Sequence, residues 1–113
     1  MTKYLISFPS AAMDVPLEEL PAVADAAHAV VREAQAAGVW VFGGGIDESV
    51  PPVVVDSGGE ARQGTYPQTA HLEGGYSILD LPSHEAAVEW GAKFATACRC
   101  PQEIRAFGED AEA

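Results

Sequence analysis

The sequence predicts an α+β fold: a split βαβ arrangement with an inserted β-hairpin, whose antiparallel sheet carries both helices on one face. Two stretches place apolar residues at helical spacing, and short runs of aromatic and branched residues flank each of them. A Gly-rich turn between two further short runs supplies the hairpin. Because such a two-layer sandwich leaves one sheet face uncovered, we expect a second copy of the chain to cover it as a homodimer.

Length and charge limit the class of protein. With 113 residues, 48% of them hydrophobic, the chain is expected to form one domain over residues 1–108, followed by an acidic tail at 109–113. The net charge of −11 argues against nucleic-acid partners and anionic membrane surfaces. No run approaches the ~20 apolar residues of a membrane span, and no cleavage-type signal follows Met1, so a cytoplasmic protein is expected.

The first half of the chain is predicted to form a strand, a helix and a second strand. Residues 3–8 (KYLISF) form a strand closed by Pro9, and residues 39–42 (VWVF) form a short buried strand. The helix begins between residues 16 and 21 and ends at Gly38. Its apolar stripe consists of Leu20, Val23, Ala27, Val30, Val31 and Ala34. The run Gly43-Gly44-Gly45 is predicted to be a structural turn.

The second half is predicted to hold the hairpin, a strand, a helix and a last strand. Residues 53–56 and 60–63 pair across the glycines at 58–59, and residues 64–75 form an ordered loop. Residues 76–81 (YSILDL) form the next strand. Ser83 is a predicted N-cap, and Pro101 ends the second helix. Residues 103–107 (EIRAF) close the sheet.

The stretch GTYPQTAHLEGGYSILDLPSHEAAVEWGAKF at residues 64–94 resembles the central part of the YCII-related family, in the branch named for its DGPF motif. The resemblance implies a ferredoxin-like fold in a dimeric α+β barrel. The family's Asp-Gly-Pro-Phe falls on Gln63-Gly64-Thr65-Tyr66, and its Glu-Thr-Lys-Glu falls on Gln68-Thr69-Ala70-His71. A carboxylate-based role for this loop is therefore not supported. Most of the family has no assigned reaction, although some members are proposed to use a His and Asp dyad whose His lies close to His28.

His28 and His71 are the candidate catalytic residues, because imidazole transfers protons near neutral pH. The resemblance implies that the loop holding His71 lines a cleft. Asp47, just after the glycine run, could orient His28. For each of these three residues, an ordinary solvated or half-buried role is the alternative. His84, in the first turn of the second helix, is assigned no role.

Candidate ligand contacts surround these groups. Tyr66 and Tyr76 could donate hydrogen bonds to a ligand oxygen, and the backbone of Gly44 and Gly45 could approach a ligand closely. Trp40 could join the two tyrosines in an aromatic wall, but core packing explains it equally well, and a structural turn is the better interpretation of the glycine run. Asp80 joins a pocket if it faces the open side of the sheet.

Metal and cofactor motifs are absent from the sequence. Cys98 and Cys100 are expected to be two reduced thiols, with no ligand spacing for a metal. The glycine run matches no nucleotide-binding motif, so no cofactor is expected.

Two functions remain open at this point. The chain could be a small-molecule enzyme of isomerase, lyase or dehalogenase type that uses His-based acid/base chemistry. The alternative is a non-catalytic dimer that binds a small ligand or has a regulatory role. A weaker third possibility is a structural partner of another protein.

Overall fold

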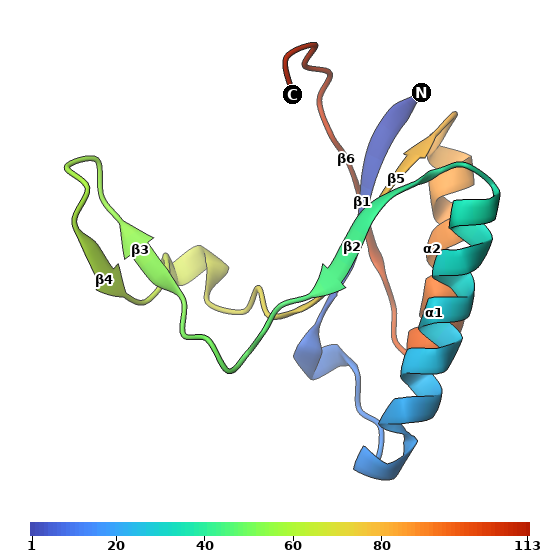
Figure 1. The fold of residues 1–113 in the computed structure, drawn as a ribbon, viewed down its shortest axis with the longest axis horizontal. Helices are drawn as coiled ribbons and strands as arrows, with labels where there is room; N and C mark the ends of the chain where they lie inside the picture. Colours follow the sequence, from blue (N-terminus) through green and yellow to red (C-terminus); the bar gives the residue numbers. More distant parts are fainter.

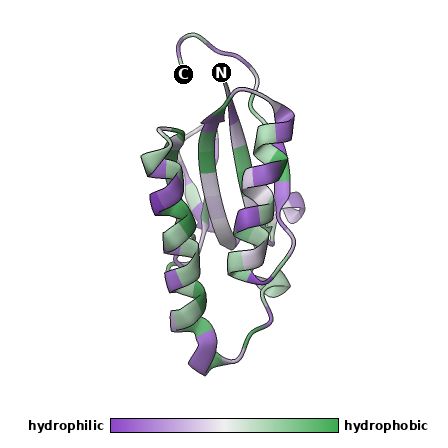
Figure 2. Ribbon diagram, turned by 90° about the vertical axis from the view of Figure 1, so that its right-hand side faces the viewer, coloured by the Kyte–Doolittle hydropathy of each residue, from purple (hydrophilic) through white to green (hydrophobic).

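The computed structural model describes residues 1–113 as two layers, an antiparallel sheet of four strands and two helices that cover one of its faces (Figures 1 and 2). The sheet order is β2-β5-β1-β6. Its strands are β1 at Thr2–Pro9, β2 at Trp40–Gly45, β5 at Gly74–Leu81 and β6 at Glu103–Ala106. The helices are α1 at Leu20–Ala36 and α2 at His84–Cys98. The predicted α+β architecture is thereby confirmed. Neither helix has the length and apolar character needed to cross a bilayer.

The two helices begin and end at the signals that the sequence carries. Pro21 stands in the first turn of α1, where the missing N–H has no intrahelical partner to lose. Ser83 caps α2, since its side chain accepts a hydrogen bond of 3.1 Å from the Ala86 backbone N–H. Arg99 ends α2 in the left-handed conformation with a φ of 57°.

The hydrophobic core lies between the sheet and the helices. β1 pairs antiparallel with β5, so Tyr4 lies opposite Leu79, and both point toward the helices. The core residues are Tyr4, Ile6, Val30, Ala34, Leu79, Leu81, Ala87, Phe94 and Ala97. The opposite face, called the outer face below, carries the side chains that alternate with these. They are Lys3, Leu5, Ser7, Phe42, Tyr76, Ile78, Asp80, Glu103 and Arg105.

The glycine run was expected to be a turn, and the structure corrects this: Gly43, Gly44 and Gly45 form the second half of β2 and pair with β5. The reason is the Trp40 ring, which folds over the Gly43 backbone. A Cβ on Gly43 would lie 2.4 Å from a carbon of that ring. Glycine thus serves close packing here, and the strand continues through it.

The predicted hairpin is confirmed as β3 at Val53–Val55 paired with β4 at Ala61–Gln63. Asp56 stabilises its turn by accepting hydrogen bonds from the backbone N–H groups of Gly58 and Glu60. We call residues 50–64 the arm. The arm stands away from both layers, on the side of the sheet opposite the helices (Figure 1).

Candidate functional site

A cavity of about 660 Å³ lies between the N-terminal half of α1 and the end of the sheet where β2 finishes. The helix and the sheet both carry small residues where they face the cavity. α1 contributes Ala24 and Ala27, and the sheet contributes Gly43, Gly45 and Gly75. Because none of these side chains reaches across the gap, the two layers leave a hollow instead of a packed core.

Two aromatic rings line the hollow and rest on glycine backbone. Trp40 covers Gly43, and the Phe8 ring lies where a Cβ on Gly75 would be, 2.6 Å from its nearest ring carbon. At the inner end, α2 closes the cavity with Phe94. Of the 23 lining residues 13 are hydrophobic, which makes the interior suited to an apolar body.

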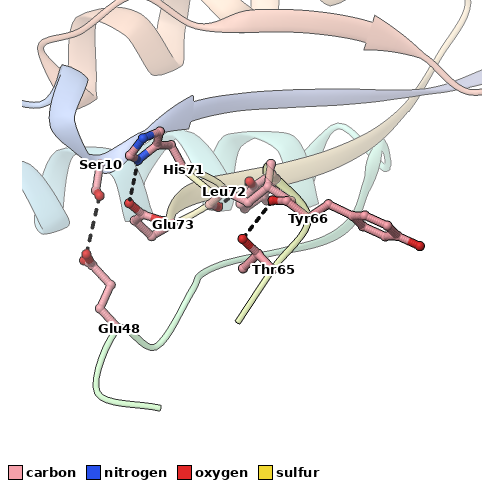
Figure 3. A network of polar contacts seen from close by, with 8 residues as sticks. Ser10, Glu48, Thr65, Tyr66, His71, Leu72 and Glu73 are labelled. Atoms are coloured by element: carbon pink, nitrogen blue, oxygen red, sulfur yellow. Dashed lines mark hydrogen bonds and ion pairs between the residues drawn. The ribbon is translucent and has the colours of Figure 1, made fainter. Parts of the chain in front are cut away.

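Polar groups are few and lie mainly at the rim. His28 is exposed on α1, and Ser10 and Glu48 come from the loops after β1 and β2. The Ser10 hydroxyl donates to a Glu48 carboxylate oxygen at 3.5 Å and joins the two loops (Figure 3). No Lys or Arg lines the cavity, so the charge at its mouth is acidic.

Four of the predicted site residues line this cavity, namely His28, Tyr76, Gly44 and Gly45, although the Tyr76 side chain alternates onto the outer face of the sheet. The Tyr76 hydroxyl donates to the Leu72 backbone carbonyl, which fixes the loop before β5 to the strand. The phenol is thus already engaged within the fold.

Asp47 does not pair with His28 in this structure. Its carboxylate accepts hydrogen bonds from the Ser49 hydroxyl at 2.6 Å and from the Ser49 backbone N–H at 3.0 Å. Both hydrogen bonds lower the pKa of Asp47 because they favour the charged carboxylate, and the bond from the Ser49 hydroxyl has the larger effect. The predicted orienting residue is therefore occupied in its own turn.

His71 and Tyr66 lie outside the cavity. The His71 side chain is 89% exposed, with its Nδ1 atom 3.7 Å from a Glu73 carboxylate oxygen (Figure 3). Tyr66 is 69% exposed, and its ring points away from the neighbouring polar contacts (Figure 3). The loop that holds both residues forms a short 3-10 turn at Pro67–Thr69.

Asp80 faces the outer side of the sheet, across from Lys3. One of its carboxylate oxygens is buried without a hydrogen-bond partner. Asp80 therefore faces the open side of the sheet, which was the condition for its joining a pocket. It does not, however, line the cavity beside α1.

Sequence reasoning missed Ser10, Glu48 and Gln102 as cavity residues. Glu48 adjoins the candidate Asp47 and could have been found as the alternative carboxylate of the same turn. Ser10 and Gln102 carry no sequence signal, because they reach the cavity through the loop after β1 and the loop after α2. Gln102 is held there by donating to the Cys100 carbonyl at 3.3 Å.

Both cysteines are buried free thiols, and Cys98 lines the inner end of the cavity. Burial, with a smaller contribution from neighbouring Cys100, raises the pKa of Cys98 to about 11. A thiol in this state is a weak nucleophile at neutral pH. No three His, Cys, Asp or Glu side chains converge as a metal-binding group.

No family model matches the chain, and no curated protein is significantly similar to it in sequence. The geometry of the cavity is therefore the basis for a functional proposal.

Proposed function

We propose that the chain binds a compact, mainly apolar small molecule, neutral or cationic, in the cavity between α1 and the sheet. The observation that carries this proposal is the aromatic-lined hollow of about 660 Å³, which has an imidazole and a carboxylate at its rim and no Lys or Arg. Its volume lies within the range of about 300–1,000 Å³ usual for small-molecule sites. An anion would meet Glu48 without a compensating Lys or Arg.

The setting of the cavity is a YCII-related homodimer. The strand order β2-β5-β1-β6 and the two helices on one face support the ferredoxin-like fold implied by the sequence resemblance. The uncovered outer face supports dimerisation as an α+β barrel.

A matched pair of fluorescent probes tests the ligand class. N-phenylnaphthylamine is neutral, and anilinonaphthalene sulfonate is the same ring system with an anionic group. We expect the neutral probe to bind and the sulfonate to bind at least about tenfold more weakly, a difference of about 1.4 kcal/mol. Equal or tighter binding of the sulfonate would contradict the proposed ligand class.

Two double variants locate the binding. Ala24→Leu with Ala27→Leu places two larger side chains in the cavity, and should weaken binding of the neutral probe at least tenfold. The control is Ala22→Leu with Ala29→Leu, which makes the same chemical change at exposed α1 positions outside the cavity lining. Equal loss of binding in both variants would place the probe elsewhere.

A second candidate is an acid/base enzyme, favoured by the presence of His28 and Glu48 on one rim. His28 would remove a proton next to a ligand carbonyl and return it, as an isomerase or lyase requires. Cyclohexanone in deuterated water tests this without knowledge of the substrate. Deuterium uptake next to the carbonyl, followed by NMR, should be faster with the wild type than with His28→Asn. Equal rates in the two proteins would leave binding without catalysis.

A further inference from the structure

The arm exposes apolar side chains that no part of its own chain covers. Val53 and Val55, two residues apart on one face of β3, are 58% and 60% exposed. Val50 and Tyr66, at its base and just beyond it, are 63% and 69% exposed. A two-stranded hairpin alone is marginally stable in water and needs a further strand or a packing surface. The arm therefore has the properties of an element that packs against another molecule.

The arm makes the molecule more extended than a compact domain of its length. The Cα radius of gyration is 15.6 Å, whereas a compact chain of this length has about 13 Å. The excess comes from the arm, which projects away from the sheet on its outer side (Figure 1). The arm and the outer face therefore lie on the same side of the molecule.

The outer face carries exposed apolar side chains along β2, and the charges on its strands balance. Phe42 is 65% exposed and Val41, at the bulge of β2, is 45% exposed. The charged side chains on this face are Lys3, Arg105, Asp80 and Glu103, two of each sign. The chain as a whole carries −11. Apart from the tail residues Glu109 and Asp110, which lie beside Lys3, Val41 and Ile78, a second copy therefore meets a face without net charge.

The outer face alone is too small for a stable dimer. The four strands are four to eight residues long, and from the usual strand spacing and rise their face covers about 400 Å². A stable interface buries about 800 Å² on each partner. The exposed surface of the arm is the part of the molecule that lies on the same side and can make up the difference.

We infer that the arm clasps a second copy of the chain: the two outer faces pack together, and each arm lies against the partner's sheet. This inference rests on the homodimer proposed above and adds the arm as an essential contact. The arrangement is isologous, so each arm makes the same contact in both directions and every substitution in it acts twice.

The first experiment measures the dimer dissociation constant by analytical ultracentrifugation. We expect Val53→Asp with Val55→Asp to raise it at least a hundredfold. The control, Leu17→Asp with Val88→Asp, changes two exposed apolar residues away from the arm and adds the same charge. It should leave the dissociation constant within a fewfold of the wild type. Circular dichroism should show all three proteins folded, because the arm stands outside the core.

Amide hydrogen exchange over residues 50–64 is the second measurement. At concentrations above the dissociation constant the arm should be protected, and on dilution its exchange should accelerate with the loss of the dimer. A dimer with a rapidly exchanging arm, or with unchanged affinity in the arm variant, would overturn the clasp and leave the homodimer standing. A wild type that is monomeric at every concentration would overturn both. An arm protected equally in the monomer would show that it packs on its own chain.

Discussion

The two ends of the helix–sheet interface differ in one property, the size of the residues that face each other. At the end near the chain's N-terminus, Tyr4, Leu79 and Leu81 fill the space under the helices and are at most 6% exposed. At the other end β2 and β5 present Gly43 and Gly75, and the layers enclose a cavity. The comparison teaches that a binding hollow can be made within a continuous sheet by small residues placed in register.

We call the end with Tyr4, Leu79 and Leu81 the packed end and the end with the cavity the hollow end. Shortening a side chain should destabilise the protein far more at the packed end than at the hollow end. Leu79 is fully buried in the core, so Leu79→Ala removes apolar contacts and leaves a void. We expect it to lower the free energy of unfolding by about 3 kcal/mol. Urea denaturation measures this. A loss below about 1 kcal/mol would mean that the two ends are packed alike.

At the hollow end, adding side-chain atoms should lower the stability. A Cβ on Gly43 would lie 2.4 Å from the Trp40 ring and 2.8 Å from the Tyr76 carbonyl oxygen. Gly43→Ala should therefore cost about 2 kcal/mol, as overpacking does. Gly44 is the matched control, because a Cβ there meets nothing within 4 Å. Gly44→Ala should change the stability by less than about 0.5 kcal/mol in the same urea experiment.

An equal cost at both glycines would point to strand flexibility as the common cause. A larger cost for Gly43→Ala than for Gly44→Ala would support the packing of Trp40 on Gly43, because Gly43 and Gly44 are neighbours in the same strand.

The fold was largely predictable from local signals. Helical spacing, the Ser83 cap and the glycines at 58–59 each act over a few residues, so the helices and the hairpin appear where they were predicted. The glycine run was predicted wrongly as a turn. The run pairs with β5, and glycine at position 43 leaves room for the Trp40 ring; no periodicity in the sequence contains either contact.

The cavity was less predictable, because it depends on which small residues of α1 face which glycines of the sheet. Ala24 and Ala27 are good helix formers anywhere, and only the packing gives them a role as cavity walls. His28 was predicted as a candidate catalytic residue, and it lies at the cavity rim. The expected partner, Asp47, is engaged by Ser49 two residues later, a local turn that competes with any distant contact.

Cys98 tests whether the hollow end is dry, because its thiol is 5% exposed and lines the cavity. Burial, with a smaller contribution from Cys100, raises the pKa of Cys98 to about 11, whereas an unfolded chain loses this proton near about 8.5. Between these values the folded state holds more protons than the unfolded state, so the free energy of unfolding should fall as the pH rises. In Cys98→Ala that fall should be shallower, as measured by urea midpoints across about pH 8.5 to 11. Parallel pH profiles in the two proteins would mean that water reaches the thiol, and the contrast between a packed end and a dry hollow end would then fail.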